Sequence, residues 1–269
     1  MSLKPGNTEG HSFSDFTFSE NLEVCNYYEN WVERDSKSKR IDKRKICFMY
    51  TKKSHCGSCQ LFKSDLEYVI PSQFKCLEKV MNDDGRITVA EYISSSRKTK
   101  EEYSLLVLTA VSNNGGNHPD SLIVDVFPTK NNPIFCINSA GDFIFNYEED
   151  ELVIYENKMS FNFKESKRIH LHCHGLKGMF FNKDDTKLIV YYKGTADFFD
   201  FDKENLTITL AYKIRDSDGL ISTICMSPDD ALIVTKNTED TIKVWSRDDS
   251  NKFQIIQRID TSFEVVQIS

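Results

Sequence analysis

The sequence predicts an all-β protein built from a repeated unit of four short strands. Phe, Tyr and Trp make up 12% of the 269 residues, and aromatic residues are enriched in strands. The same junction recurs along the chain: an apolar residue is followed by Ser or Asn, and then by a turn that is usually acidic. A pattern that recurs at a regular distance is the signature of a repeat architecture.

The junctions define the period of the repeat. The last three distances between successive junctions are 44, 45 and 42 residues, whereas the first two are 63 and 56. The longer distances are explained by loop-like insertions at 33–45, 94–102 and 113–119. We expect a polar tail over 1–12 and units that start near residues 13, 74, 133, 175, 220 and 262. The junctions are Phe18-Ser19, Met81-Asn82, Ile137-Asn138, Phe181-Asn182, Met226-Ser227 and Ile268-Ser269.

Strands are clearest in the two most regular units. The fifth unit contains apolar, alternating runs at 231–237, 241–245 and 253–259, and the fourth contains them at 187–192, 196–201 and 206–214. Four short strands with tight connections, repeated about every 40–45 residues, are typical of the blades of a β-propeller. A β-sandwich whose meanders share one length is the alternative.

The fifth unit resembles a WD repeat. It has an apolar-Ser-Pro-Asp turn, a Thr on its second strand, an acidic turn and then Lys-Val-Trp. In that family a His before the first strand, a Ser or Thr on the second, an Asp in the following turn and a Trp on the third form a hydrogen-bonded lock. The resemblance implies that Thr235 and Trp245 are the Thr and Trp of this lock. Glu239 or the adjacent Asp240 stands at the Asp position, and Ser217 stands at the His position. The fourth unit keeps a histidine, His172, at the His position.

Five units are complete, and residues 262–269 repeat the first strand of a sixth. We therefore expect five blades and one further strand of an incomplete six- or seven-bladed ring. The remaining blades would be absent from this chain or contributed by another molecule. An unpaired strand and an uncovered apolar face favour association, so self-association through the open edge is a further expectation.

Topology separates the His and Cys residues that could bind a metal. Naming the strands a to d in chain order, the b–c and d–a connections lie at one end of a blade and the a–b and c–d turns at the other. His170, His172 and His174 fall in a d–a connection, whereas Cys56 and Cys59 fall in a c–d connection. The two groups therefore cannot share one ion, and we expect no cofactor. A metal site at the three histidines, or a metal- or thiol-dependent enzyme using residues 170–174 or the Cys56/Cys59 pair, is the alternative function.

A basic segment at 33–45 is the strongest candidate for partner binding. We expect a solvated loop that trypsin cuts first, or a docking element for an acidic or phosphorylated partner, because guanidinium groups bind phosphate through two hydrogen bonds. No aromatic residue lies among its cations, which disfavours single-stranded nucleic acid. The candidates are Arg34, Lys37, Lys39, Arg40, Lys43, Arg44 and Lys45.

Bulk properties and motifs favour a binding protein. The net charge of −7 disfavours general nucleic-acid affinity. The longest apolar run, 103–111, is too short to cross a bilayer, and eight scattered cysteines without a secretory signal favour the cytoplasm or nucleus. Phosphate-binding loops, nucleophile elbows and His-Glu-x-x-His motifs are absent from the sequence. We therefore expect a non-catalytic scaffold that binds other proteins or peptides.

We predict that replacement of Trp245 by Ala lowers the free energy of unfolding by about 3–5 kcal/mol, because the side chain is expected to be buried beside Thr235. Chemical denaturation monitored by circular dichroism measures this change. Native fluorescence from Trp245 like that of free tryptophan, after subtraction of the Trp31 signal, would contradict the assignment.

Overall fold

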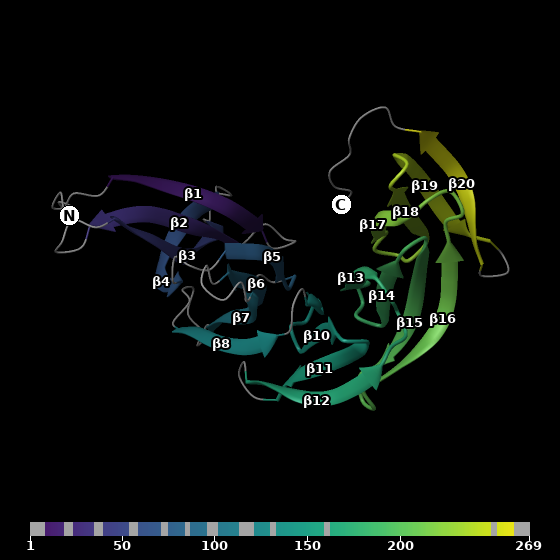
Figure 1. Ribbon diagram of the computed structural model, residues 1–269, viewed down its shortest axis with the longest axis horizontal. Helices are drawn as coiled ribbons and strands as arrows, with labels where there is room; N and C mark the ends of the chain where they lie inside the picture. Colours follow the sequence, from purple (N-terminus) through teal and green to yellow (C-terminus); the bar gives the residue numbers. More distant parts are fainter. Residues whose placement is uncertain are drawn as a thin grey trace. The chain divides into compact units, whose positions relative to one another are not determined.

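The computed structural model consists of β-strands joined by turns in the residues that it describes (Figure 1). Over these ranges, no helix long and apolar enough to cross a membrane is found. The described residues are 9–18, 24–34, 40–53, 59–70, 75–83, 87–95, 102–112, 121–129, 133–158, 162–248 and 252–260.

The strands form five antiparallel sheets of four strands, and in each sheet the strands lie in chain order. The predicted all-β class, with four-stranded units, is therefore confirmed. The chain divides into two compact units, residues 1–133 with two sheets and residues 134–269 with three. The expected strand at 262–269 lies outside the described residues.

The first unit contains the first and second sheets. Its first strand begins at Glu9, within the stretch that was expected to be a polar tail. The strands of the first sheet are β1 (Glu9–Phe18), β2 (Val24–Arg34), β3 (Arg40–Lys53) and β4 (Cys59–Ile70); those of the second are β5 (Lys75–Met81), β6 (Ile87–Ser95), β7 (Glu102–Ser112) and β8 (Ser121–Thr129).

The prediction of a loop over residues 33–45 is wrong for most of its length. The ladder between β2 and β3 continues to the pair Arg34 and Arg40, so only residues 35–39 connect the two strands. Charged composition suggested a loop, but strand preference depends on pairing context more than on residue type. The long β2–β3 ladder sets the local structure here.

The second unit contains the third, fourth and fifth sheets. The strands of the third sheet are β9 (Ile134–Ile137), β10 (Phe143–Glu148), β11 (Glu151–Asn157) and β12 (Phe163–His170). Those of the fourth are β13 (Leu176–Phe181), β14 (Lys187–Tyr192), β15 (Thr195–Asp202) and β16 (Thr207–Arg215). Those of the fifth are β17 (Ile221–Met226), β18 (Leu232–Asn237), β19 (Thr241–Arg247) and β20 (Phe253–Asp260).

An aromatic core joins the third sheet to the fourth. Alternate residues of β10 and β11 turn one face of the third sheet toward β13, β14 and β15. The rings of Phe145 and Phe201 lie edge to face with centroids 5.1 Å apart, and Phe145 contacts Phe181 at 4.9 Å. Burial of one such side chain contributes about 1.5–3 kcal/mol, so this face stabilises the pair of sheets strongly.

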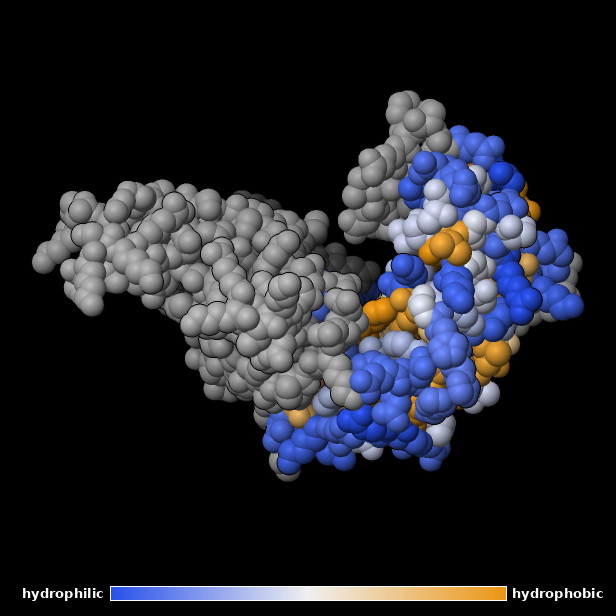
Figure 2. Space-filling model, viewed as in Figure 1, coloured by the Kyte–Doolittle hydropathy of each residue, from blue (hydrophilic) through white to orange (hydrophobic). Residues whose placement is uncertain are grey.

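A second core joins the fourth sheet to the fifth. Ile189, Ala196 and Phe198 of the fourth sheet are fully buried against Ile233 and Trp245 of the fifth. Hydrophilic residues cover most of the described surface that Figure 2 shows on this unit. The apolar residues are thus used mainly between neighbouring sheets.

The junction residues explain how each a–b turn is held. The side-chain oxygen of Asn138 accepts a hydrogen bond from the Phe143 amide at 2.8 Å, and that of Ser227 accepts from the Leu232 amide at 2.9 Å. Asn82 and Asn182 accept equivalent bonds in their own turns. The recurring Asn or Ser therefore ties the end of strand a to the start of strand b.

Two aspartates extend these bonds from one sheet to the next, in what we call the turn clasp. Asp185 of the fourth sheet accepts hydrogen bonds from the Asn138 side-chain amide at 2.8 Å and the Ser139 backbone amide at 2.7 Å. Asp230 of the fifth sheet accepts one from Asn182 at 3.0 Å. The two aspartates have φ of 55° and 57°, a left-handed conformation that Asp tolerates better than most residues.

We predict that replacement of Asp185 by Asn lowers the free energy of unfolding by about 1–3 kcal/mol, because an amide nitrogen would face a donor and the charge-assisted bonds would be lost. Urea denaturation measures the change. The matched control is Asp184→Asn, since Asp184 is its exposed neighbour. Equal stability of the two variants would contradict the turn clasp.

Candidate functional site

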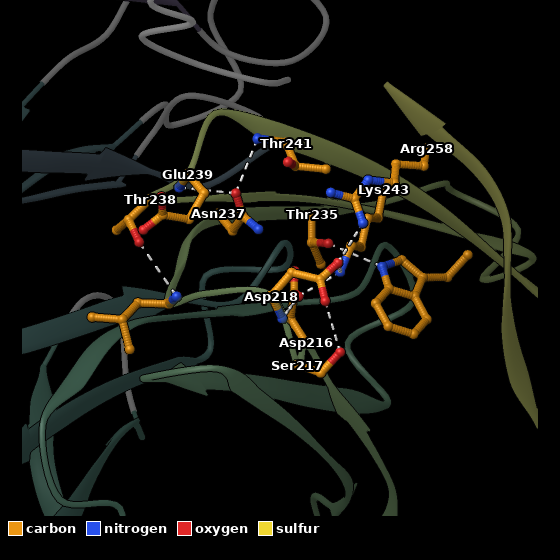
Figure 3. Close-up of polar contacts among 12 residues, drawn as sticks. Asp216, Ser217, Asp218, Thr235, Asn237, Thr238, Glu239, Thr241, Lys243 and Arg258 are labelled. Atoms are coloured by element: carbon orange, nitrogen blue, oxygen red, sulfur yellow. Dashed lines mark hydrogen bonds and ion pairs between the residues drawn. The ribbon is translucent and has the colours of Figure 1, made fainter. Parts of the chain in front are cut away.

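The end of the fifth sheet that carries its b–c turn gathers a set of charged and polar side chains (Figure 3). The connection 216–220 between β16 and β17 reaches this end, where it meets the turn 238–240 between β18 and β19. The backbone amide of Thr238 donates a hydrogen bond to the carbonyl of Leu220 at 2.9 Å. The d–a connection is thereby fixed to the b–c turn.

A buried ion pair forms the centre of this set. The Nζ of Lys243 lies 2.5 Å from Asp216 and 2.7 Å from Asp218, and the lysine side chain is only 2% exposed. Burial alone would lower the pKa of Lys243, but the hydrogen bonds to Asp216 and Asp218 outweigh it and raise the pKa. The lysine is therefore held in its charged form by the two carboxylates of the incoming connection.

A series of ion pairs, which we call the charged chain, continues from the buried Lys243 through Asp218 to Arg258 and Asp260 at the surface. Arg258 on β20 donates to Asp218 at 2.6 Å and to Asp260 at 3.1 Å. The bonds from Lys243 and Ser217 lower the pKa of the Asp218 carboxyl, so it is ionised near neutral pH. Arg258 and Asp260 are more than half exposed, and they can contact a partner.

The two lock residues on β18 and β19 lie together. The indole Nε1 of Trp245 donates to the Thr235 hydroxyl at 2.9 Å, and the two residues are 6% and 0% exposed. The other lock positions differ from the prediction. Glu239 is exposed in the b–c turn, and the exposed Asp240 forms an ion pair with the buried Lys236 at 2.9 Å.

The predicted histidine positions are shifted by one residue. Ser217 and His172 are both exposed, whereas the residues immediately before them, Asp216 and Leu171, are buried. Neither predicted residue can therefore complete a buried lock. In the fifth sheet Asp216 and Lys243 take that place, with the acid on the connection and the base on strand c.

The sequence contains a signal for the burial of Lys243. Lys243 lies two residues before Trp245, so period-two alternation places both side chains on the same face of β19. A lysine on a buried face requires a carboxylate partner, and the nearest incoming segment is Asp216-Ser217-Asp218. No comparable periodicity fixes which residue of that connection points inward.

The three candidate metal-binding histidines are exposed around buried Leu171 and Cys173. The rings of His170 and His172 lie edge to face with centroids 4.3 Å apart, while His174 Nδ1 is 3.4 Å from Asp150. In the part of the chain that the structure describes, no three His, Cys, Asp or Glu side chains are grouped so that they could hold a metal ion. Cys56 lies outside that part, and Cys59 begins β4.

Cys173 is unsuited to act as a nucleophile. Burial, with a smaller effect from the nearby Asp197 carboxylate, raises the pKa of its thiol to about 11. A thiol with this pKa is protonated at neutral pH, and the thiolate is the reactive form.

The connection between β12 and β13 is fixed by Tyr147, a residue that the sequence pattern did not indicate. The hydroxyl of Tyr147 contacts the carbonyls of Leu171 and Cys173 at 3.3 and 3.2 Å, and it donates to Asp150 at 2.9 Å. Desolvation by burial, with the bond to Asp150, raises the pKa of the phenol above its usual range. Each d–a connection in this unit is thus held by its own side-chain chemistry.

Comparison with known proteins identifies the fold. No family model and no curated protein sequence matches the chain. Sqt1 from Chaetomium thermophilum, bound to the N-terminus of the ribosomal protein L10, is similar in structure with a TM-score of 0.56 and 10% identity, over 93% of this chain and 74% of that chain. The chain is a β-propeller. Its four-stranded sheets are the blades.

Propellers with different functions share this similarity. The periplasmic gluconolactonase PpgL of Pseudomonas aeruginosa matches with a TM-score of 0.50 and 10% identity, over 91% of this chain and 84% of that chain. At this identity the likeness establishes the fold alone, because one fold carries many functions.

The basic candidates lie at the b–c end of the first blade. Arg34 ends β2, and Arg40, Lys43, Arg44 and Lys45 lie on β3. Lys37 and Lys39 fall outside the described residues. Register places Arg34 directly opposite Arg40.

We predict that Lys243→Met lowers the free energy of unfolding of the propeller by about 3–5 kcal/mol, because Asp216 would be buried without its partner. The double variant Lys243→Met with Asp216→Leu should recover most of this loss, since Leu171 occupies the equivalent loop position before β13. Urea denaturation of the four proteins of the cycle measures the coupling. A double variant as unstable as Lys243→Met would contradict a compensated ion pair.

Proposed function

We propose that this propeller is a non-catalytic scaffold of the WD-repeat type that binds a protein or peptide partner. The similarity to Sqt1 supports a binding role, since that propeller is bound to a segment of another protein. A stiff stack of blades holds connecting segments in fixed positions, and such segments carry function in many folds. The Thr235–Trp245 hydrogen bond, at two positions of the family lock, supports the WD-repeat type.

The observation that carries the proposal is the use of the polar side chains in the fifth blade. Lys243 and Asp216 bond to each other, and Thr235 bonds to Trp245. Groups fixed in this way stabilise the blade and position its surface. Arg258 and Asp260, at the exposed end of the charged chain, are available to a partner.

The basic end of the first blade supports an acidic or phosphorylated partner. Like charges placed directly opposite one another destabilise an antiparallel pair, and Arg34 opposite Arg40 is such a pair. With Lys43, Arg44 and Lys45 on the same strand end, positive charge is concentrated here in a chain of net charge −7. An anionic partner would be attracted to this positive charge.

We predict that the triple variant Arg40→Glu, Lys43→Glu and Arg44→Glu weakens binding of a fluorescein-labelled oligoglutamate or phosphoserine peptide at least about tenfold, at about 0.5 kcal/mol for each charge pair with the peptide. Fluorescence anisotropy measures the affinity, which should also fall as salt rises. The matched control, with the same change of net charge, is Lys164→Glu with Lys177→Glu and Lys252→Glu, at three exposed lysines of the second unit. Equal loss in both variants would show that only net charge matters and would contradict a basic docking surface.

The competing function is a metal- or thiol-dependent enzyme, for which the similarity to gluconolactonase PpgL is the relevant observation. Elemental analysis of the purified protein, together with a gluconolactone hydrolysis assay, distinguishes the two functions. Stoichiometric zinc, or hydrolysis abolished by alkylation of cysteine, would favour the enzyme over the scaffold.

A further inference from the structure

One face of the fifth blade is less buried than the matching faces of the two blades before it. We call it the open face. It is defined by register, since Val234 pairs with both Cys225 and Val244, and Ile242 pairs with Ile259. The opposite face, with Ile233 and Trp245, packs on the fourth blade. The apolar residues of the open face are Cys225, Val234, Ile242, Val244 and Ile259, and Lys236 lies among them opposite Ile242.

Equivalent residues in the fourth and third blades are buried completely. The fourth-blade residues at the positions of Val234, Ile242 and Val244 are each 0% exposed, and so are those of the third blade. In the fifth blade these three residues are partly exposed, and Ile259 is 41% exposed where its fourth-blade equivalent Ile214 is 4% exposed. The buried equivalents are Ile189, Ala196 and Phe198 in the fourth blade, and Phe145, Leu152 and Ile154 in the third.

The two complete interfaces show what covers such a face. Strand a of the following blade contributes two buried residues three positions apart: Leu176 and Met179 at one interface, Ile221 and Ile224 at the other. The spacing is three because a register shift follows the first of each pair. A shift of one residue changes the face on which later side chains lie, which brings both apolar residues onto the preceding blade.

The end of the sequence has apolar residues at these two positions. When "FEVVQIS" is placed on "ISTICMS" so that Ser269 matches Ser227, Phe263 falls on Ile221 and Val266 on Ile224. The intervening Glu264 falls on Ser222, which is exposed in the fifth blade. Residues 263–269 thus share the main feature of strand a, which is a pair of apolar residues three positions apart at the positions that contact the preceding blade.

We propose that residues 263–269 dock on the open face of the fifth blade, with Phe263 and Val266 against Val234, Ile242 and Val244. The ligand of this surface is a short amphipathic strand of the same chain. The register of two existing interfaces and the incomplete burial of a third carry the inference together. It does not depend on the proposed function.

Cys225 provides a direct test, because it lies on the open face while Cys136 and Cys173 are buried elsewhere in the unit. In the variant Phe263→Asp with Val266→Asp, the rate at which iodoacetamide alkylates Cys225 should rise about tenfold or more. The reason is that residues 263–269 would lose the apolar contacts that keep them docked over Cys225. Peptide mass spectrometry resolves the three cysteines, and continued protection of Cys136 and Cys173 shows that the blades remain folded. Glu264→Lys is the matched control and should leave the rate unchanged.

A second measurement applies if the double variant loses protection at all three cysteines. The protein shortened after Asp260 should expose Cys225, and a synthetic peptide of residues 262–269 should restore its protection, whereas the peptide with both Asp substitutions should not. Equal alkylation of Cys225 in the full chain and the double variant would overturn the proposal. Protection that disappears on dilution, with a dimer seen by light scattering, would also overturn it, because a second copy would then be the occupant.

Discussion

Each blade in the second half of this chain depends on its neighbour to cover an apolar sheet face. A four-stranded sheet with aromatic and branched residues on both faces cannot bury them alone, and Phe145, Ile189 and Phe198 reach full burial only through the blade that follows. This constraint explains why the repeat is visible in sequence at all. Buried polar side chains such as Thr235 and Lys243 bond to defined partners inside the stack.

The buried polar contacts fix the blades in register. Apolar packing is nondirectional, whereas the bonds of Asp185 to Asn138 and of Lys243 to Asp216 each require one relative position of the connected segments. Replacement of a buried ion pair by apolar residues often leaves stability nearly unchanged, but loss of one member is costly. In the fifth blade the Lys243–Asp216 ion pair fixes the connection before β17, whereas Tyr147 of the third blade fixes the connection before β13. Different side chains thus hold equivalent connections in place.

Much of the fold could be predicted from sequence, because period-two alternation and a recurring turn are local signals. Trp245 and Thr235 were placed correctly as neighbours for the same reason, since both lie on regular strands. The connection before β17 has no periodicity, so the sequence pattern does not distinguish Ser217 from Asp216 as the residue that points inward. The basic segment was expected to be a loop on composition, yet Arg40 to Lys45 extend β3. In the sequence Asp185 and Asp230 are visible only as members of acidic turns, because their bonding partners belong to another repeat and no local pattern reveals them.

The turn clasp has a direction, since in both of its instances, Asp185 with Asn138 and Asp230 with Asn182, the carboxylate comes from the later blade. The side-chain amide of Asn138 can form its hydrogen bond only after Asp185, 47 residues later in the chain, has been synthesised. At a typical synthesis rate of 5–20 residues per second, that delay is about 2–10 s on the ribosome. The third blade therefore emerges with its a–b turn incompletely bonded and is finished by the blade made after it. The position of this one carboxylate in the sequence therefore makes the last bonds of the third blade's turn depend on synthesis of the fourth blade.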